Sequence, residues 1–215
     1  NVITDLQGAN QECCSSMQTS WLLRETIATN REQGNTVYVG LLDTSKAFDT
    51  VWIDGMLYQL YLTGMDGKLW RILRSFYQDF KCAVRIGGYI SDWFIALQGV
   101  HQGAYWSMEM YMHMNNEMLK VLKHCGKGCQ VRQIKSGNPT FADDISLTAL
   151  YKPDLQRMLD IAYQFSTRWR FQFNAGKRED MVFGQDQCPD QIMHLGTDPI
   201  STKQRCVHIG LLLSS

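Results

Sequence analysis

Two adjacent carboxylates lie in the segment Phe141-Ala142-Asp143-Asp144, at what the pattern predicts to be the bend of a β-hairpin. Residues 145–150 alternate between apolar and small polar side chains, which is typical of a strand, and residues 136–139 supply turn chemistry before it. Neighbouring like charges repel each other unless a cation lies between them. The spacing therefore indicates that Asp143 and Asp144 are metal ligands.

A second group of acids follows another expected strand. Residues 36–42 are almost continuously apolar, Asp43 stands at the end of this run, and Asp49 comes six residues later. Carboxylates on neighbouring strands can hold hard divalent cations, which suit phosphoryl transfer. Taken alone, Asp43 is better explained as an acid that caps a turn, and Asp49 as the cap of a helix beginning near Thr50.

Composition sets the broad class of the protein. The 215 residues include 45% hydrophobic and 20% charged residues, which predicts one globular domain. Positive and negative side chains balance at 21 each, so net charge neither indicates nor excludes a nucleic-acid partner. Seven scattered cysteines favour free thiols and an intracellular location, nuclear or cytoplasmic, without a targeting signal. No apolar run reaches membrane-spanning length, so no membrane partner is expected.

The remaining pattern predicts an α+β fold, an antiparallel sheet with helices on one face. Helices are expected over residues 20–31, around residues 56–61 and 69–77, after residue 103 and from residue 153, with a hairpin over 81–97 and strands at 181–183 and 206–212. The basic end of the helix after residue 103 has two interpretations, a solvated charged face or an edge that contacts phosphates. The bare N-terminus, which lacks an initiator Met, suggests an excerpt of a longer protein.

Five motifs together resemble the reverse transcriptase domain of LINE-type (non-long-terminal-repeat) retrotransposons. Their order and spacing carry the resemblance, which reaches upstream to Gln7-Gly8 and covers nearly the whole chain. The motifs are Asp43-Thr44-Ser45-Lys46-Ala47-Phe48-Asp49, Gly99-Val100-His101-Gln102-Gly103, Phe141-Ala142-Asp143-Asp144, Asn174-Ala175-Gly176-Lys177 and His208-Ile209-Gly210. Each motif alone is a weak signal, whereas five in order are a strong one.

The resemblance implies a right-hand polymerase fold for this fragment, residues 1–215. The palm would comprise about 36–51 and 99–215, and fingers-side segments about 1–35 and 52–98. The first fingers segments would be absent, because the chain begins after the point where the family carries them, and the thumb would be absent, because the chain stops just past the fifth motif. We therefore expect that the chain by itself copies RNA poorly.

The resemblance also implies the chemistry of the acids. Asp43 and Asp143 would bind two catalytic Mg²⁺ ions, for which Mn²⁺ could substitute, and Asp144 would support them as a further catalytic acid and ligand. Lys177 matches the family's lysine near the nucleotide phosphates, where it could neutralise or protonate the leaving pyrophosphate. These four residues form the implied catalytic group.

Phe48 of the first motif and the residues of two other motifs would handle the nucleotide and the primer. Phe48 falls where the family places a bulky residue against the sugar of the incoming nucleotide, so a 2′-hydroxyl would collide with its ring. Gln102 and Gly103 would lie beside the templating base pair. His208-Ile209-Gly210 corresponds to the hairpin that grips the primer end. Tyr105 departs from the family, which often has Pro there.

The implied activity is RNA-directed DNA polymerisation, with an RNA template, a DNA primer and deoxynucleoside triphosphates as partners and with flanking domains of the same polyprotein. A catalytically inactive relic that at most binds RNA is the alternative. An RNA-templated RNA polymerase is a third interpretation. Phe48 argues against it, since a smaller residue is expected where ribose must be admitted.

Overall fold

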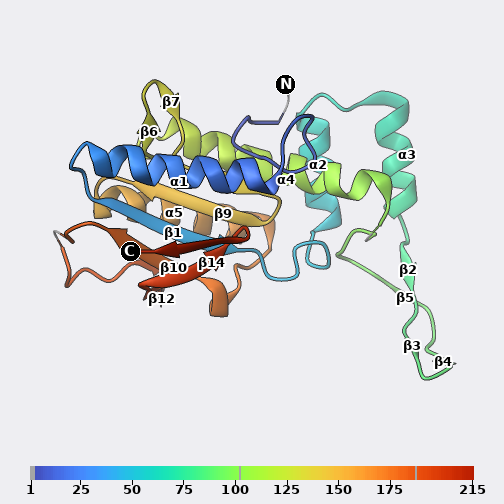
Figure 1. The fold of residues 1–215 in the computed structure, drawn as a ribbon. Coiled ribbons are helices and arrows are strands. Elements are labelled where there is room, and N and C mark those ends of the chain that lie inside the picture. The colour runs from blue at the N-terminus through green and yellow to red at the C-terminus, as the bar shows by residue number, and fades with distance from the viewer. Residues whose placement is uncertain (1–2, 102, 187) are drawn as a thin grey trace.

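Five strands form the central sheet of the protein, which a computed structural model describes over residues 3–101, 103–186 and 188–215 (Figure 1). Neighbouring strands are antiparallel, except that the edge strand Ser201–Thr202 runs parallel to its neighbour Glu179–Phe183. In spatial order the strands are β13 (Ser201–Thr202), β10 (Glu179–Phe183), β1 (Val37–Asp43), β9 (Asp144–Ala149) and β8 (Thr140–Phe141).

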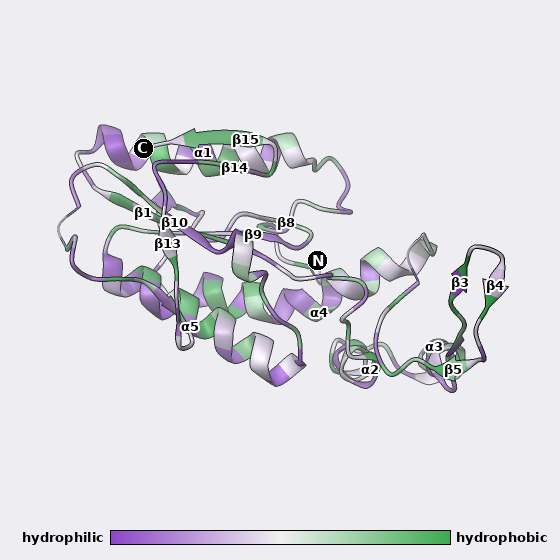
Figure 2. Ribbon diagram, turned by 90° about the horizontal axis from the view of Figure 1, so that it is seen from below, coloured by the Kyte–Doolittle hydropathy of each residue, from purple (hydrophilic) through white to green (hydrophobic). Residues whose placement is uncertain are grey.

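Both faces of this sheet are covered, because β1 is apolar on both sides. Val39 and Leu41 pack with Leu23 of α1 (Ser16–Glu32), on the face that also carries the hairpin of β14 (Arg205–His208) and β15 (Leu211–Ser214) (Figure 2). Tyr38 and Leu42 pack on the opposite face, against α4 (Tyr105–His124) and α5 (Lys152–Trp169). The α+β class is confirmed, but the expectation of helices on one face is wrong for α1.

A second group of helices lies at one end of the sheet. α2 (Ile53–Leu62) packs on α4 and on α3 (Gly67–Tyr77), and these helices share the larger core cluster with the sheet. The hairpin expected over residues 81–97 follows α3 and projects away from the body (Figure 1). Its strands pair as β2 (Lys81–Cys82) with β5 (Phe94–Ile95) and β3 (Arg85–Ile86) with β4 (Tyr89–Ile90).

Short elements complete the chain. They are β6 (Gln130–Val131) with β7 (Ile134–Lys135), the 3₁₀ turn η1 (Ala175–Lys177), and β11 (His194–Leu195) with β12 (Asp198–Pro199). The helix expected near Thr50 begins at Ile53 and has Trp52 at its N-cap, so Asp49 does not cap it. Turns occupy the stretch after β1 instead, with Lys46 at a φ of 48°.

The long helices are amphipathic. Within the described residues, no helix combines the length and the apolar character that crossing a membrane requires.

At the basic end of α4, Lys123 pairs with Asp5, and Lys127 beyond the helix pairs with Asp154 at 2.9 Å. Both lysines belong to the charged face whose phosphate contacts the sequence leaves open.

Candidate active site

The sheet brings the acidic strand ends together. Asp43 and Asp144 are directly opposite each other in the antiparallel pairing of β1 with β9. Residues paired in this way point to the same face of a sheet, with Cβ atoms about 5 Å apart. Asp143 lies in the two-residue turn between β8 and β9, next to this pair. The three acids predicted from two distant motifs therefore converge at one end of the strands of the sheet.

Gln7 holds the turn that carries Asp143. Its side chain is fully buried, its Oε1 accepts a hydrogen bond from the Ala142 amide at 2.9 Å, and its Nε2 donates to the Ala142 carbonyl at 3.2 Å. Ala142 has a φ of 56°, in the left-handed region where two-residue hairpin turns favour Gly. The two hydrogen bonds offset that strain and fix the position of the acidic turn.

Burial and mutual repulsion act on two of these carboxyl groups. The pKa of Asp144 is raised to about 6, chiefly by burial; the negative charges of Asp143 and Asp43 contribute to the rise, and Lys177 opposes it. Burial also raises the pKa of Asp143, with an added contribution from Asp43. The ionised acids are thus held together at an energetic cost that a nearby positive charge would relieve.

Lys177 supplies one such charge. Its Nζ lies 2.8 Å from Asp43 Oδ1, and the hydrogen bond to Asp43 raises the pKa of Lys177. Asn174, just before η1, donates from Nδ2 to Asp43 Oδ2 at 3.4 Å and from its backbone amide to the Asp43 carbonyl at 2.8 Å. The Asn174–Lys177 loop is therefore fastened to the end of β1, and the side chain of Lys177 stays largely exposed.

Phe48 lies near the same strand end, and its ring is half-buried. The ring stacks on Tyr111 of α4, with centroids 5.4 Å apart and planes at 27°. Its carbonyl accepts a hydrogen bond from the Val100 amide at 2.9 Å, which ties the second motif to the first. Gly103 has a φ of 88°, which Gly adopts readily, and Gln102 lies outside the described residues.

The hairpin of β14 and β15 forms one wall of a cleft that also contains Asp43 and Asp144. His208, Asp43, Asp144 and Lys177 line one cleft of about 360 Å³. Ile209 and Gly210 form the turn with φ values of 49° and 71°, and Ser20 of α1 donates a hydrogen bond to the Ile209 carbonyl at 2.6 Å. Burial lowers the pKa of His208 to about 4, so the imidazole is neutral at physiological pH.

A family model described as reverse transcriptase (RNA-dependent DNA polymerase) matches residues 3–208. The chain belongs to the reverse transcriptase family. The match extends from before Gln7 to His208, so it contains the acidic strand ends, the Asn174–Lys177 loop and the start of the β14–β15 turn.

Named relatives place this reverse transcriptase among LINE-type elements, as the sequence predicted. The RNA-directed DNA polymerase from mobile element jockey of Drosophila funebris is 27% identical over 148 residues, which are 66% of this chain and 16% of that protein. The jockey polymerase of Drosophila melanogaster is 26% identical over 159 residues, 69% of this chain and 16% of that protein. This reverse transcriptase chain thus spans 16% of the length of both relatives.

Solved telomerase structures share the fold of this reverse transcriptase. Apo telomerase from Candida tropicalis, truncated from its C-terminal domain, superposes with a TM-score of 0.63 at 12% identity, covering 96% of this chain and 39% of that one. Telomerase from Candida albicans in complex with a fragment of telomeric RNA superposes with a TM-score of 0.63 at 11% identity. The match covers 97% of this chain and 33% of that one. At these identities the likeness shows the fold alone, a polymerase palm with part of the fingers.

The acids of this reverse transcriptase suit a hard cation by donor type. Reverse transcriptases generally use divalent metal ions. Three carboxylates that repel one another match the oxygen ligands of such ions. As placed, Asp43 is bonded to Lys177 and Asn174, and no group of three His, Cys, Asp or Glu side chains within the described ranges is gathered closely enough to hold a metal. Metal binding would therefore require Lys177 to leave Asp43.

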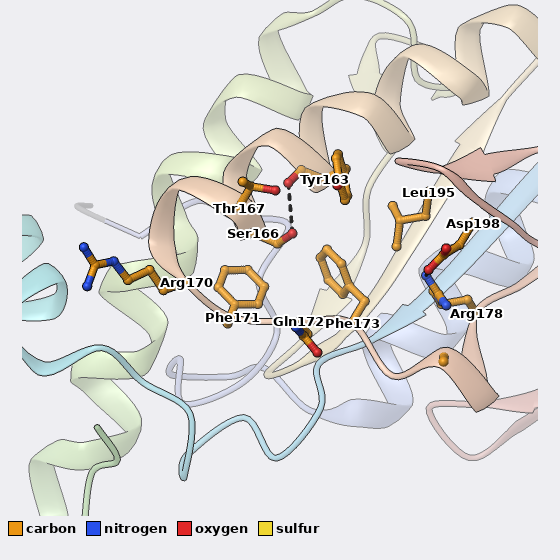
Figure 3. A pocket seen from close by; sticks show the side chains of 11 residues that line it. Tyr163, Ser166, Thr167, Arg170, Phe171, Gln172, Phe173, Arg178, Leu195 and Asp198 are labelled. Atoms are coloured by element: carbon orange, nitrogen blue, oxygen red, sulfur yellow. Dashed lines mark hydrogen bonds and ion pairs between the residues drawn. The ribbon is translucent and has the colours of Figure 1, made fainter. Parts of the chain in front are cut away.

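A larger cavity of about 590 Å³ in the reverse transcriptase lies beneath α5, away from the acids (Figure 3). The rings of Phe171 and Phe173 face its interior, and Arg178 lies beside Asp198, with which it pairs at 3.0 Å. Arg170 points away from the cavity and lies over the Trp52 ring at 4.2 Å. The metal-ligand candidates do not line this cavity, whereas Asp43 and Asp144 line the cleft beside His208.

Asp144→Asn is expected to stabilise the metal-free reverse transcriptase near pH 7, by on the order of 1 kcal/mol after allowance for partial solvent screening. The pKa of Asp144 is raised to about 6 in the folded protein, so its destabilising charge is absent below about pH 4 and complete above about pH 6. Urea unfolding in EDTA at both pH values measures the difference.

Asp190→Asn, at an exposed acid, is the matched control and should be neutral. A variant of Asp144 that is no more stable than its parent near pH 7, or whose gain persists at about pH 4, would contradict the electrostatic account of this site.

Proposed function

We propose that the chain is the catalytic palm, with part of the fingers, of the RNA-directed DNA polymerase of a LINE-type retrotransposon. It adds deoxynucleotides to a DNA primer 3′-hydroxyl on an RNA template, with flanking domains of the same polyprotein, in the nucleus or the cytoplasm. One observation carries the proposal: Asp43, Asp143 and Asp144 converge at one end of the β1 and β9 strands, and Lys177 lies against Asp43.

The division into subdomains follows the sheet. Residues 36–51 and 99–215 would form the palm, and residues 52–98, with α2, α3 and the projecting hairpin, the fingers side. Residues 1–35 are assigned to the fingers side by resemblance, and their helix α1 packs on the palm sheet through Leu23.

Asp43 and Asp143 would hold two divalent cations, Mg²⁺ or Mn²⁺, with Asp144 in support. Such ions lower the pKa of an attacking hydroxyl and neutralise charge that builds on the phosphorus. Once Lys177 has left Asp43, its ammonium group can hold the triphosphate and protonate the leaving pyrophosphate. The side chain of Lys177 is largely exposed, so it can leave Asp43 without displacing other side chains.

The other motif residues select and position the substrates. Phe48 excludes a 2′-hydroxyl by contact with its ring, which the stack on Tyr111 holds in place. Gln102 and Gly103 support the templating base pair, where Gly allows close approach of the backbone. The turn His208-Ile209-Gly210 holds the primer end across the cleft from Asp43.

Primer extension tests the proposed function. The polymerase that contains this chain is given a primed RNA template, Mg²⁺ and deoxynucleoside triphosphates, and EDTA serves as the control. We expect metal-dependent DNA synthesis. RNA binding without extension would instead identify the inactive relic, and a preference for ribonucleotides would identify an RNA-templated RNA polymerase.

Phe48→Val is expected to raise kcat/KM for ribonucleotides relative to deoxynucleotides by about tenfold or more, because the collision with the 2′-hydroxyl is relieved. The kcat/KM for deoxynucleotides should change little. Phe183→Val, at a half-buried aromatic residue of β10, is the matched control. If the sugar preference of the Phe48 variant equals that of the parent, Phe48 is a packing residue and not the sugar filter.

A further inference from the structure

Tyr111 packs beneath the residue assigned to sugar selection. It lies on α4, its side chain has no exposed surface, and its ring makes the stacking contact with Phe48. Phe48 also packs against the larger core cluster, and its backbone carbonyl accepts the hydrogen bond from the Val100 amide, but within the described residues Tyr111 is the aromatic ring that stacks on it. The position of the Phe48 ring therefore depends on the Tyr111 ring.

The Phe48 segment needs such a support, because neither a helix nor a strand sets its conformation. Residues 45–50 form turns between β1 and α2, with Lys46 in the left-handed region. Side chains on turns take their positions from packing. α4, in contrast, is buried between α2 and α5 and provides a rigid surface.

The hydroxyl of Tyr111 reaches the metal-ligand segment from the same helix. It lies against Thr44, the residue that follows Asp43, and against Asn115, and both groups lower the pKa of Tyr111 while burial raises it more strongly. Asp143 and Asp43 are close enough for their charges to raise this pKa as well. All three polar groups are buried, and within the described part of the chain none of their side-chain polar atoms has a partner at hydrogen-bond geometry.

One side chain thus touches two functional parts. The ring of Tyr111 supports Phe48, and its hydroxyl adjoins the end of β1 that carries Asp43. Discrimination between sugars depends on the distance between the Phe48 ring and the nucleotide that the acids hold. The Tyr111 ring sets one end of this distance through its stack on Phe48, and the position of its hydroxyl shows how near that ring lies to the strand end that carries Asp43.

We infer that Tyr111 is a positioning residue for sugar selection. Its ring holds the Phe48 ring in the position where a 2′-hydroxyl would collide with it. The inference rests on the proposed function of the site. Without the Tyr111 ring, Phe48 can tilt into the space beneath it, and a ribose is then admitted although Phe48 itself is unchanged.

Tyr111→Leu and Tyr111→Phe separate the ring from the hydroxyl. In the polymerase that contains this chain, Tyr111→Leu should lower the ratio of kcat/KM for deoxynucleotides to that for ribonucleotides by about tenfold. Tyr111→Phe keeps the ring and should keep the ratio within about twofold. Phe165→Leu, a buried aromatic residue of the same core cluster that does not stack on Phe48, is the matched control and should leave the ratio unchanged.

A double-mutant cycle with Phe48 tests the mechanism. If Tyr111 acts through Phe48, adding Tyr111→Leu to Phe48→Val should produce no further change in the ratio. Thermal unfolding checks that each variant folds. If Tyr111→Leu does not fold, Tyr111→Met, which lacks the ring but fills similar volume, is measured in its place.

Two outcomes overturn the inference, and they differ from each other. An unchanged sugar ratio in a folded Tyr111→Leu or Tyr111→Met variant, while the parent extends primers, overturns the inference alone. A parent protein that extends no primer contradicts the proposed function and with it the inference.

Discussion

Asp143→Asn is expected to lower kcat for primer extension by about a thousandfold or more and to leave the fold intact. The substitution keeps the shape of the side chain but removes one charged ligand from the proposed metal site. Burial already raises the pKa of Asp143, and Asp43 adds repulsion, so loss of the charge does not weaken the folded state. Asp43→Asn should have a comparable effect on kcat.

Primer extension with Mg²⁺ measures the loss, and circular dichroism with thermal unfolding shows that the fold persists. Asp190→Asn, at an exposed acid that belongs to none of the five motifs, should retain parental activity. Activity within a few fold of the parent in the Asp143 variant would remove this residue from the catalytic group, whatever the family membership of the chain.

The acidic site itself was predictable from the sequence, because its residues lie in local patterns. Asp43 ends an apolar run, and Asp143 and Asp144 precede an alternating one, so strand periodicity located all three acids. The register that sets Asp43 opposite Asp144 is a property of the folded sheet. Sequence order alone predicted that the strands are neighbours but not which residues face each other.

The sequence analysis named Gln7 and Asn174 within its motifs but did not predict that they support the site, since these supports act over long sequence distances. Gln7 fixes the turn at Ala142 across 135 positions of the chain, and Asn174 reaches Asp43 across 131. Tyr111 lies in the helix that was expected after residue 103, and its sequence neighbours give no sign of a role in the site. A buried polar side chain has no local sequence signature, so nothing short of the fold distinguished Gln7 from a surface residue.

Three expectations of the fold were wrong. Asp49 does not cap the helix that begins at Ile53. The pattern of residues 206–212 predicted one strand, whereas the structure has the hairpin that the resemblance placed at His208-Ile209-Gly210, with Ile209 in a left-handed turn that Ser20 of α1 holds by a hydrogen bond. The helix α1 was expected on the same face as α5. Both faces of β1 are apolar, and α1 buries the face that α5 leaves open.

Lys177→Met is expected to lower kcat by about a hundredfold, because the leaving pyrophosphate loses its proton donor. The same change should not weaken divalent-metal binding. Lys177 is bonded to Asp43 in the metal-free protein. Removing the ammonium group frees the Asp43 carboxylate and should increase its affinity for the divalent ion. A fall in kcat together with a lower Mg²⁺ requirement is therefore the signature of this residue.

The pH profile distinguishes a proton donor from a fixed positive charge. An acid acts in its protonated form, so kcat of the parent should fall as pH rises through the pKa of Lys177, which Asp43 raises above its ordinary value in the metal-free protein. The Met variant should lack this alkaline decline. Lys203→Met, at an exposed lysine beyond β13, is the matched control and should retain both rate and profile. A Lys177 variant with a parental kcat would show that Lys177 only neutralises Asp43 before the metal arrives.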